Sequence, residues 1–174
     1  YQKLGDNPEA KGVFDLDSIQ LIATVAQMNS GYLLSGREMK KAPEFLIGGA
    51  ANPFAVPFEM RLIRLYKKVK AGVNFIQTQP VFDPELFIRW MEKVVEMGLH
   101  EKVAILAGVM PVKSVNTLLH MREDVPGVKI NDVYIQRMEK AADPQAEGIK
   151  IAVEIIQTVK NIKGIRGVHI MPFM

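Results

Sequence analysis

The sequence contains no cysteine and no long apolar segment. Without cysteine among its 174 residues, the chain cannot form a disulfide or bind a metal or an iron-sulfur cluster through thiolates. No apolar run approaches the roughly 20 residues that a membrane-spanning helix needs. The absence of cysteine fits a reducing compartment, and we therefore expect a cytoplasmic location. The absence of a long apolar run predicts that the chain has no membrane span.

The sequence also lacks a large excess of charge of either sign. The chain has 22 Lys and Arg against 19 Asp and Glu, which gives a net charge of +3. One predicted helix carries the main concentration of cations, namely Arg61, Arg64, Lys67, Lys68 and Lys70. The regular series of aromatic residues that is typical of nucleic-acid surfaces is lacking, so no nucleic-acid partner is expected. These cations form either a solvated helix face or a site for an anion such as a cofactor phosphate.

The sequence lacks a G-x-G-x-x-G turn, the strongest signature of a dinucleotide-binding Rossmann half. It does contain apolar strand segments that begin near Phe45, Val73, Val103 and Val168, with amphipathic helices between them. Such repeated β-α units predict an α/β fold with a parallel sheet. A closed barrel and an open doubly wound sheet both fit this pattern. We favour a (β/α)8 TIM barrel, of which residues 1–174 form a single partial domain, the later half.

Several helix starts carry local capping signals. Asp17 precedes an amphipathic segment, and Gln20 stands at the position that completes a capping box. Asp83 and Asp143 are each followed by a proline, which favours the first position of a helix. Ser114 is the predicted N-cap of a shorter helix.

Small residues mark the end of the strand predicted over Phe45–Ile47. Gly48, Gly49 and Ala51 allow a flat ligand to approach the backbone closely, although tight packing requires the same residue types. The next predicted strand ends at Gln79, whose amide has donors and an acceptor suited to the edge of a planar heterocycle. A hydrogen bond that caps the strand end is the alternative. Together these residues indicate a ligand across the carboxyl ends of the strands.

Asp6 is the acidic residue that stands out. It follows Gly5 in a Gly-Asp-x-Pro turn, which would place it at the reactive end of a barrel. A turn-forming aspartate that bonds its own backbone is the alternative. The three histidines do not cluster, so no metal site is expected. We expect His100 at the surface after a helix, His120 on a helix, and His169 as a hydrogen-bonded interior residue of the last strand.

An ordered set of motifs resembles the methylenetetrahydrofolate reductase family of flavin-containing barrels. The set covers nearly the whole chain in the right order and spacing. Its glycine-rich member is most similar to the enzymes of acetogen-type one-carbon metabolism. The matching pieces are Gly5-Asp6-x-Pro8, Phe14-Asp15-x-Asp17-Ser18, Gly48-Gly49-Ala50-Ala51-Asn52-Pro53, Lys68-Val69-x-Ala71-Gly72, Gln77-Thr78-Gln79-Pro80-x-Phe82-Asp83, Ala107-Gly108-Val109-Met110-Pro111, Glu147-Gly148-Ile149 and Gly167-Val168-His169.

The resemblance implies a barrel that holds FAD at the strand ends, with this chain covering roughly the end of strand 4 to strand 8. It implies reduction of 5,10-methylenetetrahydrofolate to 5-methyltetrahydrofolate, in one-carbon metabolism and methionine biosynthesis. NADH, NADPH or another electron donor reduces the FAD, and the folate then receives hydride from the flavin. Barrels of this family commonly associate into homo-oligomers, and acetogen-type relatives often work with an iron-sulfur partner subunit.

The resemblance also assigns residues. Asp6 and Gln79 match the catalytic and substrate-binding positions, with Asp6 beside the flavin and pterin and Gln79 bonding the pterin and the nicotinamide amide. Thr117 aligns with a substrate-side polar residue. The positions that match the FAD site are Gly5, Asp6, Phe14, Asp15, Gly48, Asn52, Arg64, Lys67 and Lys68.

The sequence differs from the family pattern at three points. The family's general acid, a glutamate on the first strand, has no counterpart in the chain, and the arginine after the eighth strand would lie beyond Met174. Asn131 stands where relatives usually have proline. Because half a barrel leaves strand edges unpaired, we expect the chain alone to be inactive and to need a complementing half or a larger protein. Two alternatives stay open: a non-catalytic flavin- or folate-binding half-barrel, and a barrel enzyme for a phosphorylated metabolite.

Overall fold

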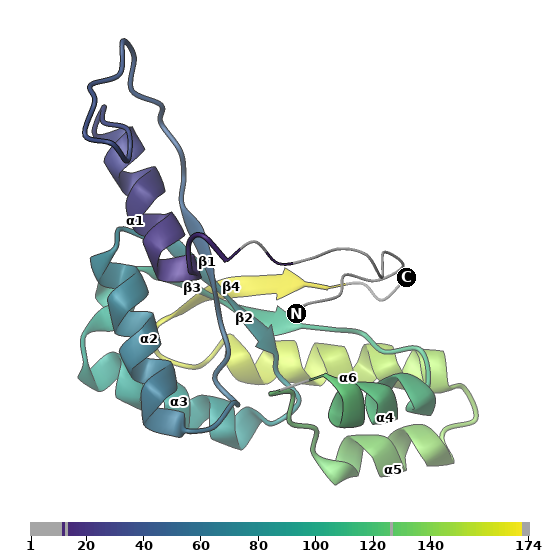
Figure 1. The fold of residues 1–174 in the computed structure, drawn as a ribbon. Coiled ribbons are helices and arrows are strands. Elements are labelled where there is room, and N and C mark those ends of the chain that lie inside the picture. Colours follow the sequence, from purple (N-terminus) through teal and green to yellow (C-terminus); the bar gives the residue numbers. More distant parts are fainter. Residues whose placement is uncertain (1–11, 13, 126, 172–174) are drawn as a thin grey trace.

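The computed structural model describes residues 12, 14–125 and 127–171. Helices and strands alternate along most of this part of the chain (Figure 1). The elements in chain order are α1 (Ser18–Asn29), β1 (Gly48–Ala51), α2 (Phe58–Lys70), β2 (Phe75–Pro80), α3 (Pro84–Glu96), the short 3-10 helix η1 (Leu99–Glu101), β3 (Ala104–Val109), α4 (Val115–Asp124), α5 (Asp132–Lys140), α6 (Pro144–Val159) and β4 (Ile165–Ile170).

The strands form one sheet in which every neighbouring pair is parallel and the spatial order β1-β2-β3-β4 follows the chain order. A doubly wound sheet reverses its order at a switch point, whereas a (β/α)8 barrel adds each strand beside the last. The described strands show no reversal. The predicted α/β class and partial barrel are therefore confirmed, and the open-sheet alternative loses its support.

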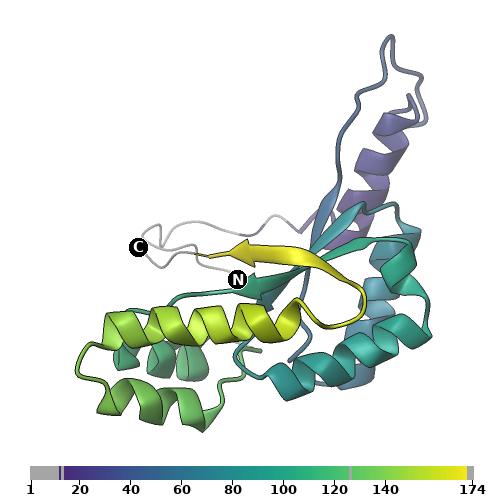
Figure 2. The ribbon, with the colours of Figure 1, turned by 180° about the vertical axis from the view of Figure 1, so that it is seen from behind.

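The core lies between the sheet and the helices that pack on it, α2, α3 and α6 (Figure 2). Ile76 of β2 and Ile105 of β3 are register partners and are completely buried. Phe87 of α3 contacts two further buried rings, with centroid distances of 6.3 Å to Phe54 and 5.9 Å to Trp90. Because burying one such side chain stabilises a fold by roughly 1.5–3 kcal/mol, this layer fixes the helices against the sheet.

All predicted helix caps are confirmed. Asp17 and Gln20 form the reciprocal hydrogen bonds of a capping box at the start of α1. The side chains of Asp83, Ser114 and Asp143 accept hydrogen bonds from backbone N–H groups in the first turns of α3, α4 and α6.

The predicted strand over Phe45–Ile47 is wrong, because the ladder to β2 begins only at Gly48. Polar side chains bind the backbone before that point. The amide of Asn29 both accepts from and donates to the backbone of Phe45, at 2.9 Å each, and the Ile47 N–H donates to Asn74 Oδ1 at 2.8 Å. The Asn29 contacts hold Phe45 beside α1. Ile47 instead contacts the start of β2, because its carbonyl also accepts from the N–H groups of Asn74 and Phe75, at 2.8 and 3.3 Å.

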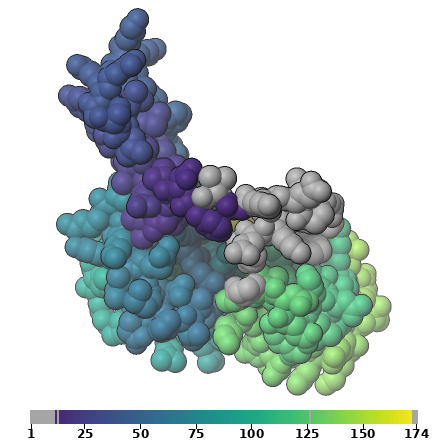
Figure 3. Space-filling view, in the orientation of Figure 1, coloured from purple at the N-terminus to yellow at the C-terminus, as the bar shows by residue number. Residues whose placement is uncertain are grey.

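α1 and the connection that follows it project from the body of the molecule (Figures 1 and 3). The predicted polar connection contains an isolated antiparallel bridge between Tyr32 and Glu38. His100 is another correction, because its side chain is only 12% exposed. Its Cβ packs where a side chain on Gly164 would stand, so the turn before β4 covers it. None of the helices in the described part of the chain is both long and apolar enough to cross a membrane.

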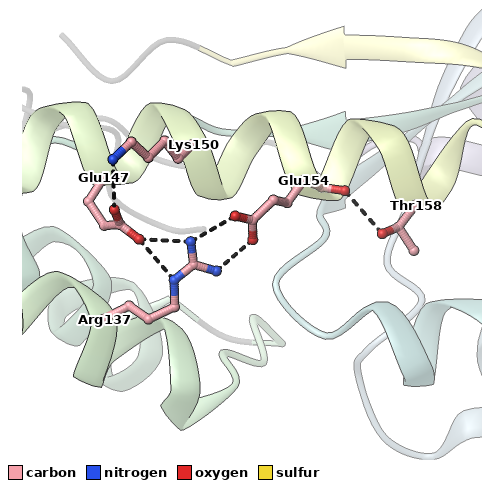
Figure 4. Close-up of polar contacts among 5 residues, drawn as sticks. All are labelled: Arg137, Glu147, Lys150, Glu154 and Thr158. Atoms are coloured by element: carbon pink, nitrogen blue, oxygen red, sulfur yellow. Dashed lines mark hydrogen bonds and ion pairs between the residues drawn. The ribbon is translucent and has the colours of Figure 1, made fainter.

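A network of ion pairs joins α5 to α6 (Figure 4). The Arg137 guanidinium bonds both carboxylate oxygens of Glu154, and its Nε donates to Glu147 Oε1 at 2.9 Å. The hydrogen bonds from Arg137 hold the pKa of Glu154 below its ordinary value. The network therefore connects two helices that follow each other outside the sheet.

We predict that Arg137→Ala lowers the free energy of unfolding by about 1 kcal/mol, the upper part of the range for exposed pairs, because its bonds are bidentate. Urea denaturation measures this loss. Since the folded pKa of Glu154 is depressed, the contribution is complete above the ordinary glutamate pKa of 4.5 and disappears as the pH falls through the lowered value. Lys93→Ala, which breaks the exposed Lys93–Glu96 pair, is the control. An equal loss in both variants at every pH contradicts this prediction.

Candidate functional site

The carboxyl ends of the parallel strands lie at one edge of the sheet, where Ala51, Pro80, Val109 and Ile170 end β1 to β4. In parallel α/β folds the segments after these ends form the ligand site. Gln79 lies at this edge, and Asn52 directly follows β1. Gly5 and Asp6 lie outside the described residues.

Gly48 and Gly49 have a packing reason for their missing side chains. A Cβ on Gly48 would lie 2.4 Å from the ring of Phe75, and one on Gly49 would lie 3.2 Å from Val73. The packing alternative thus accounts for both glycines at the start of β1, and the exposed Ala50 keeps the later part of the strand small.

Lys68 does not belong to a solvated helix face. Its side chain is buried, and Nζ donates a hydrogen bond of 2.5 Å to the Ala50 carbonyl at the end of β1. Burial, and then the nearby charge of Arg64, lowers the pKa of Lys68. Lys67 is exposed one position earlier on α2, so the structure separates the two adjacent lysines.

Two hollows meet at Lys68. The first, of about 40 Å³, is lined by the end of β1 and by one stripe of α2, namely Ala50, Ala51, Asn52, Arg61, Arg64, Leu65 and Lys68. The second, of about 480 Å³, is mostly apolar and lies between α1 and β1; its lining includes Leu21, Ile22, Phe45 and Ile47. A small cationic hollow therefore adjoins a larger apolar one.

Cations predominate in the smaller hollow. None of the ion pairs among the described residues involves Arg61, Arg64 or Lys68. Arg61 was not among the predicted site residues. It stands three positions before Arg64 and seven before Lys68, a spacing that places all three on one helix stripe. That periodicity is the signal in the sequence that identifies it.

Gln79 is held by a polar network across three strands. The Thr78 hydroxyl donates to the Gln79 carbonyl at 3.0 Å and accepts from the Gly108 N–H at 2.9 Å. His169 Nε2 donates to the Thr78 carbonyl at 3.1 Å. The predicted hydrogen bond of this histidine is therefore confirmed, although its side chain is half-buried and not fully interior. The ladder between β2 and β3 shifts register between Gln77 and Pro80. The network fixes the backbone at this irregularity, from which the Gln79 side chain extends.

The other predicted residues have different surroundings. Phe14 and Asp15 precede α1 and are exposed, and Phe14 has a positive φ of 55°. The Thr117 hydroxyl lies 3.0 Å from Ser114 Oγ within the cap of α4. In the described part of the chain no group of three or more His, Asp and Glu side chains could hold a metal ion.

The chain-ordered parallel sheet with polar residues at its carboxyl edge places the chain in the class of (β/α)8 barrels. A family model described as methylenetetrahydrofolate reductase matches residues 21–173. The chain therefore belongs to the methylenetetrahydrofolate reductase family.

Individual relatives give the same result. The chain is 28% identical over 140 residues to the 5,10-methylenetetrahydrofolate reductase of Escherichia coli, which covers 75% of this chain and 46% of that protein. It is 34% identical over 102 residues to methylenetetrahydrofolate reductase 2 of Schizosaccharomyces pombe, covering 56% of this chain and 16% of that protein. The chain thus spans less than half of the length of these relatives.

A solved structure shares the fold. It is an uncharacterised protein from Clostridium thermocellum, described as binding two copies of 5-methyl-5,6,7,8-tetrahydrofolic acid. It superposes with a TM-score of 0.61 at 18% identity, over 76% of this chain and 48% of that one. At this identity the likeness supports the fold.

We predict that Gly108→Ala destabilises the protein by about 1–3 kcal/mol, the usual effect of overpacking. The new Cβ would lie 2.5 Å from the Thr78 carbonyl oxygen, so the backbone beneath Gln79 must move. Gly167→Ala on β4 is the matched control, because its Cβ would meet Leu106 at an ordinary 3.4 Å. Urea denaturation compares the two variants, and equal stabilities would show that Gly108 is not constrained in this way.

Proposed function

We propose that this chain forms the cofactor-phosphate and pterin-binding part of a flavin-dependent methylenetetrahydrofolate reductase. The reaction is the reduction of 5,10-methylenetetrahydrofolate to 5-methyltetrahydrofolate. The observation that carries the proposal is the cation-lined hollow at the end of β1, beside the strand that holds Gln79. Membership of the family gives this geometry its chemical interpretation.

The residues present fit FAD. Arg64 and Lys68 form no ion pair among the described residues, the Asp17 carboxylate offsets their charge only in part, and a diphosphate would supply further negative charge. Exposed Lys67 adds a further cation on the same helix. The large hollow beside α1 is mostly apolar, as ligand sites for flat ring systems usually are. When bound, FAD supplies the hydride chemistry.

The chain's own residues bind and orient the reactants. Lys68 holds negative charge at the end of β1, where its ammonium also fixes the Ala50 carbonyl. The Gln79 amide donates to and accepts from the pterin, or from the nicotinamide amide of NADH or NADPH. The Thr78–His169 bond keeps the backbone of Gln79 in place during this exchange. By the family resemblance, Asp6 would be the acid that tunes the flavin and helps to bind the pterin.

The remaining parts of the activity come from outside these residues. The general acid of the family has no counterpart in the chain, so another segment or subunit supplies it. Because these 174 residues contain no cysteine, any iron-sulfur cluster in the electron path is bound outside them. The Clostridium thermocellum protein that shares this fold is described as binding a folate, which supports a folate as the substrate. We also propose a cytoplasmic location.

The test is a visible absorption spectrum of the purified protein that contains this chain, before and after gel filtration with FAD. Retained flavin bands, with turnover of 5,10-methylenetetrahydrofolate, are the expected result. Retained flavin without turnover for any electron donor would favour a non-catalytic binding module. Failure to retain flavin, with binding of a phosphorylated metabolite instead, would contradict the proposal.

We predict that Lys68→Met weakens FAD binding at least 10-fold, the usual scale for losing one charge-assisted hydrogen bond. Because the pKa of Lys68 is lowered, its charge is lost at a lower pH than that of an ordinary lysine. FAD affinity should therefore fall as the pH rises through that lowered pKa, and Lys68→Arg should remove this dependence. Flavin fluorescence measures the affinity, with exposed Lys70→Met as control. Equal affinities in all variants would contradict this role.

A further inference from the structure

The strand ladder beside Gln79 contains one extra residue on β2. Gln77 pairs with Leu106 and the next pair is Pro80 with Gly108, so the three steps from 77 to 80 face the two steps from 106 to 108. Such a bulge interrupts the pairing and changes the direction of a side chain. Proline is tolerated at bulges because it has no N–H group to donate to a ladder. Gln79 therefore lies within a bulge at the carboxyl edge of the sheet.

The Thr78 side chain replaces hydrogen bonding that the bulge removes from the ladder. Its hydroxyl accepts from the buried Gly108 N–H at 2.9 Å and donates to the Gln79 carbonyl at 3.0 Å. The ladder resumes beyond the bulge, where the Val81 N–H donates to the Gly108 carbonyl at 2.9 Å. Because a hydroxyl has one proton to donate, this proton is committed to Gln79. The backbone of Gln79 is therefore bound by the side chain of the residue before it.

Thr78 is too deeply buried to touch a reactant. It is only 2% exposed, whereas Gln79 is half-buried. His169 reaches past its register partner Gly108 and donates to the Thr78 carbonyl. A Cβ on Gly108 would lie 2.5 Å from that carbonyl oxygen and 2.9 Å from the carbonyl oxygen of Gln79, so both oxygens lie over Gly108. An effect of Thr78 on the reaction therefore passes through the backbone of Gln79.

We propose that Thr78 is a positioning residue whose hydroxyl fixes the backbone from which the Gln79 amide reaches the pterin. The part played by that amide rests on the proposed function, whereas the contacts of Thr78 do not. Without the hydroxyl the buried Gly108 N–H would lose its acceptor, which favours a rearrangement of the bulge. Because a displacement of about 1 Å in a positioning group lowers a rate by up to about 100-fold, even a small shift of Gln79 is measurable.

The experiment uses the full-length protein that contains this chain. Thr78→Val removes the hydroxyl at nearly constant volume, and Thr78→Ser keeps it. Thr158→Val is the matched control, because that hydroxyl also donates to a carbonyl, of Glu154 at 3.0 Å, but on the exposed side of α6 (Figure 4). One readout is the NMR signal of the Gln79 side-chain amide, identified by its loss in Gln79→Ala. The other is calorimetry with 5-methyltetrahydrofolate.

We expect Thr78→Val to shift the Gln79 amide signal and to weaken 5-methyltetrahydrofolate binding about 10-fold. Thr78→Ser should restore both, and Thr158→Val should change neither. In a Gln79→Ala background, Thr78→Val should weaken binding by less than about twofold further, because residues that act as one unit are not additive. Should Thr78→Val fail to fold, His169→Leu, which removes the donor to the Thr78 carbonyl, takes its place.

The outcomes separate this role from the proposed function. An unchanged Gln79 signal in Thr78→Val and in His169→Leu overturns the positioning role. An equal loss of affinity with and without Gln79→Ala overturns it as well, because Thr78 would then act on the fold in general. A parent protein that neither binds nor reduces folate contradicts the proposed function. If its Gln79 signal still moves in Thr78→Val and returns in Thr78→Ser, the positioning of Gln79 by Thr78 is supported.

Discussion

The parallel pairing of β2 with both of its neighbours is the constraint on which the rest of the structure depends. β2 is bonded to β1 on one side and to β3 on the other. The buried pair Ile76–Ile105 holds the second contact in register. The register shift after Gln77 then leaves Gln79 at the carboxyl edge, supported from below by Thr78 and His169. The position of one candidate catalytic amide therefore follows from sheet packing.

Local signals in the sequence predicted local structure well. The caps at Asp17, Asp83, Ser114 and Asp143 are formed by side chains within three residues of the N–H groups that they bind. The strands begin within three residues of the predicted starts, and the chain-ordered parallel sheet followed from the repeated units. These features depend on neighbours along the chain, and for that reason a single sequence is enough to identify them.

The errors come from contacts between distant residues. Asn29 and Asn74 bind the backbone around Phe45 and Ile47 from 16 and 27 positions away, which no local pattern indicates. His100 is covered by a turn more than sixty residues later in the chain. In the site, the resemblance and the basic helix indicated Lys68, but its burial and the place of Arg61 in the same hollow depend on how α2 packs against β1.

Lys68 shows how a buried cation between α2 and β1 can be compatible with a folded core. A lysine buried in apolar surroundings loses stability as a cation, yet here the Ala50 carbonyl gives its ammonium one strong acceptor. That acceptor is neutral, and neither Lys68 nor Arg64 forms an ion pair among the described residues; the nearby Asp17 carboxylate only partly offsets their charge. An arriving anion meets donors that packing already holds in place, and less side-chain entropy is then lost on binding. The cations whose charge is not fully balanced in the described residues are thus the ones to which the proposed phosphate ligand is assigned.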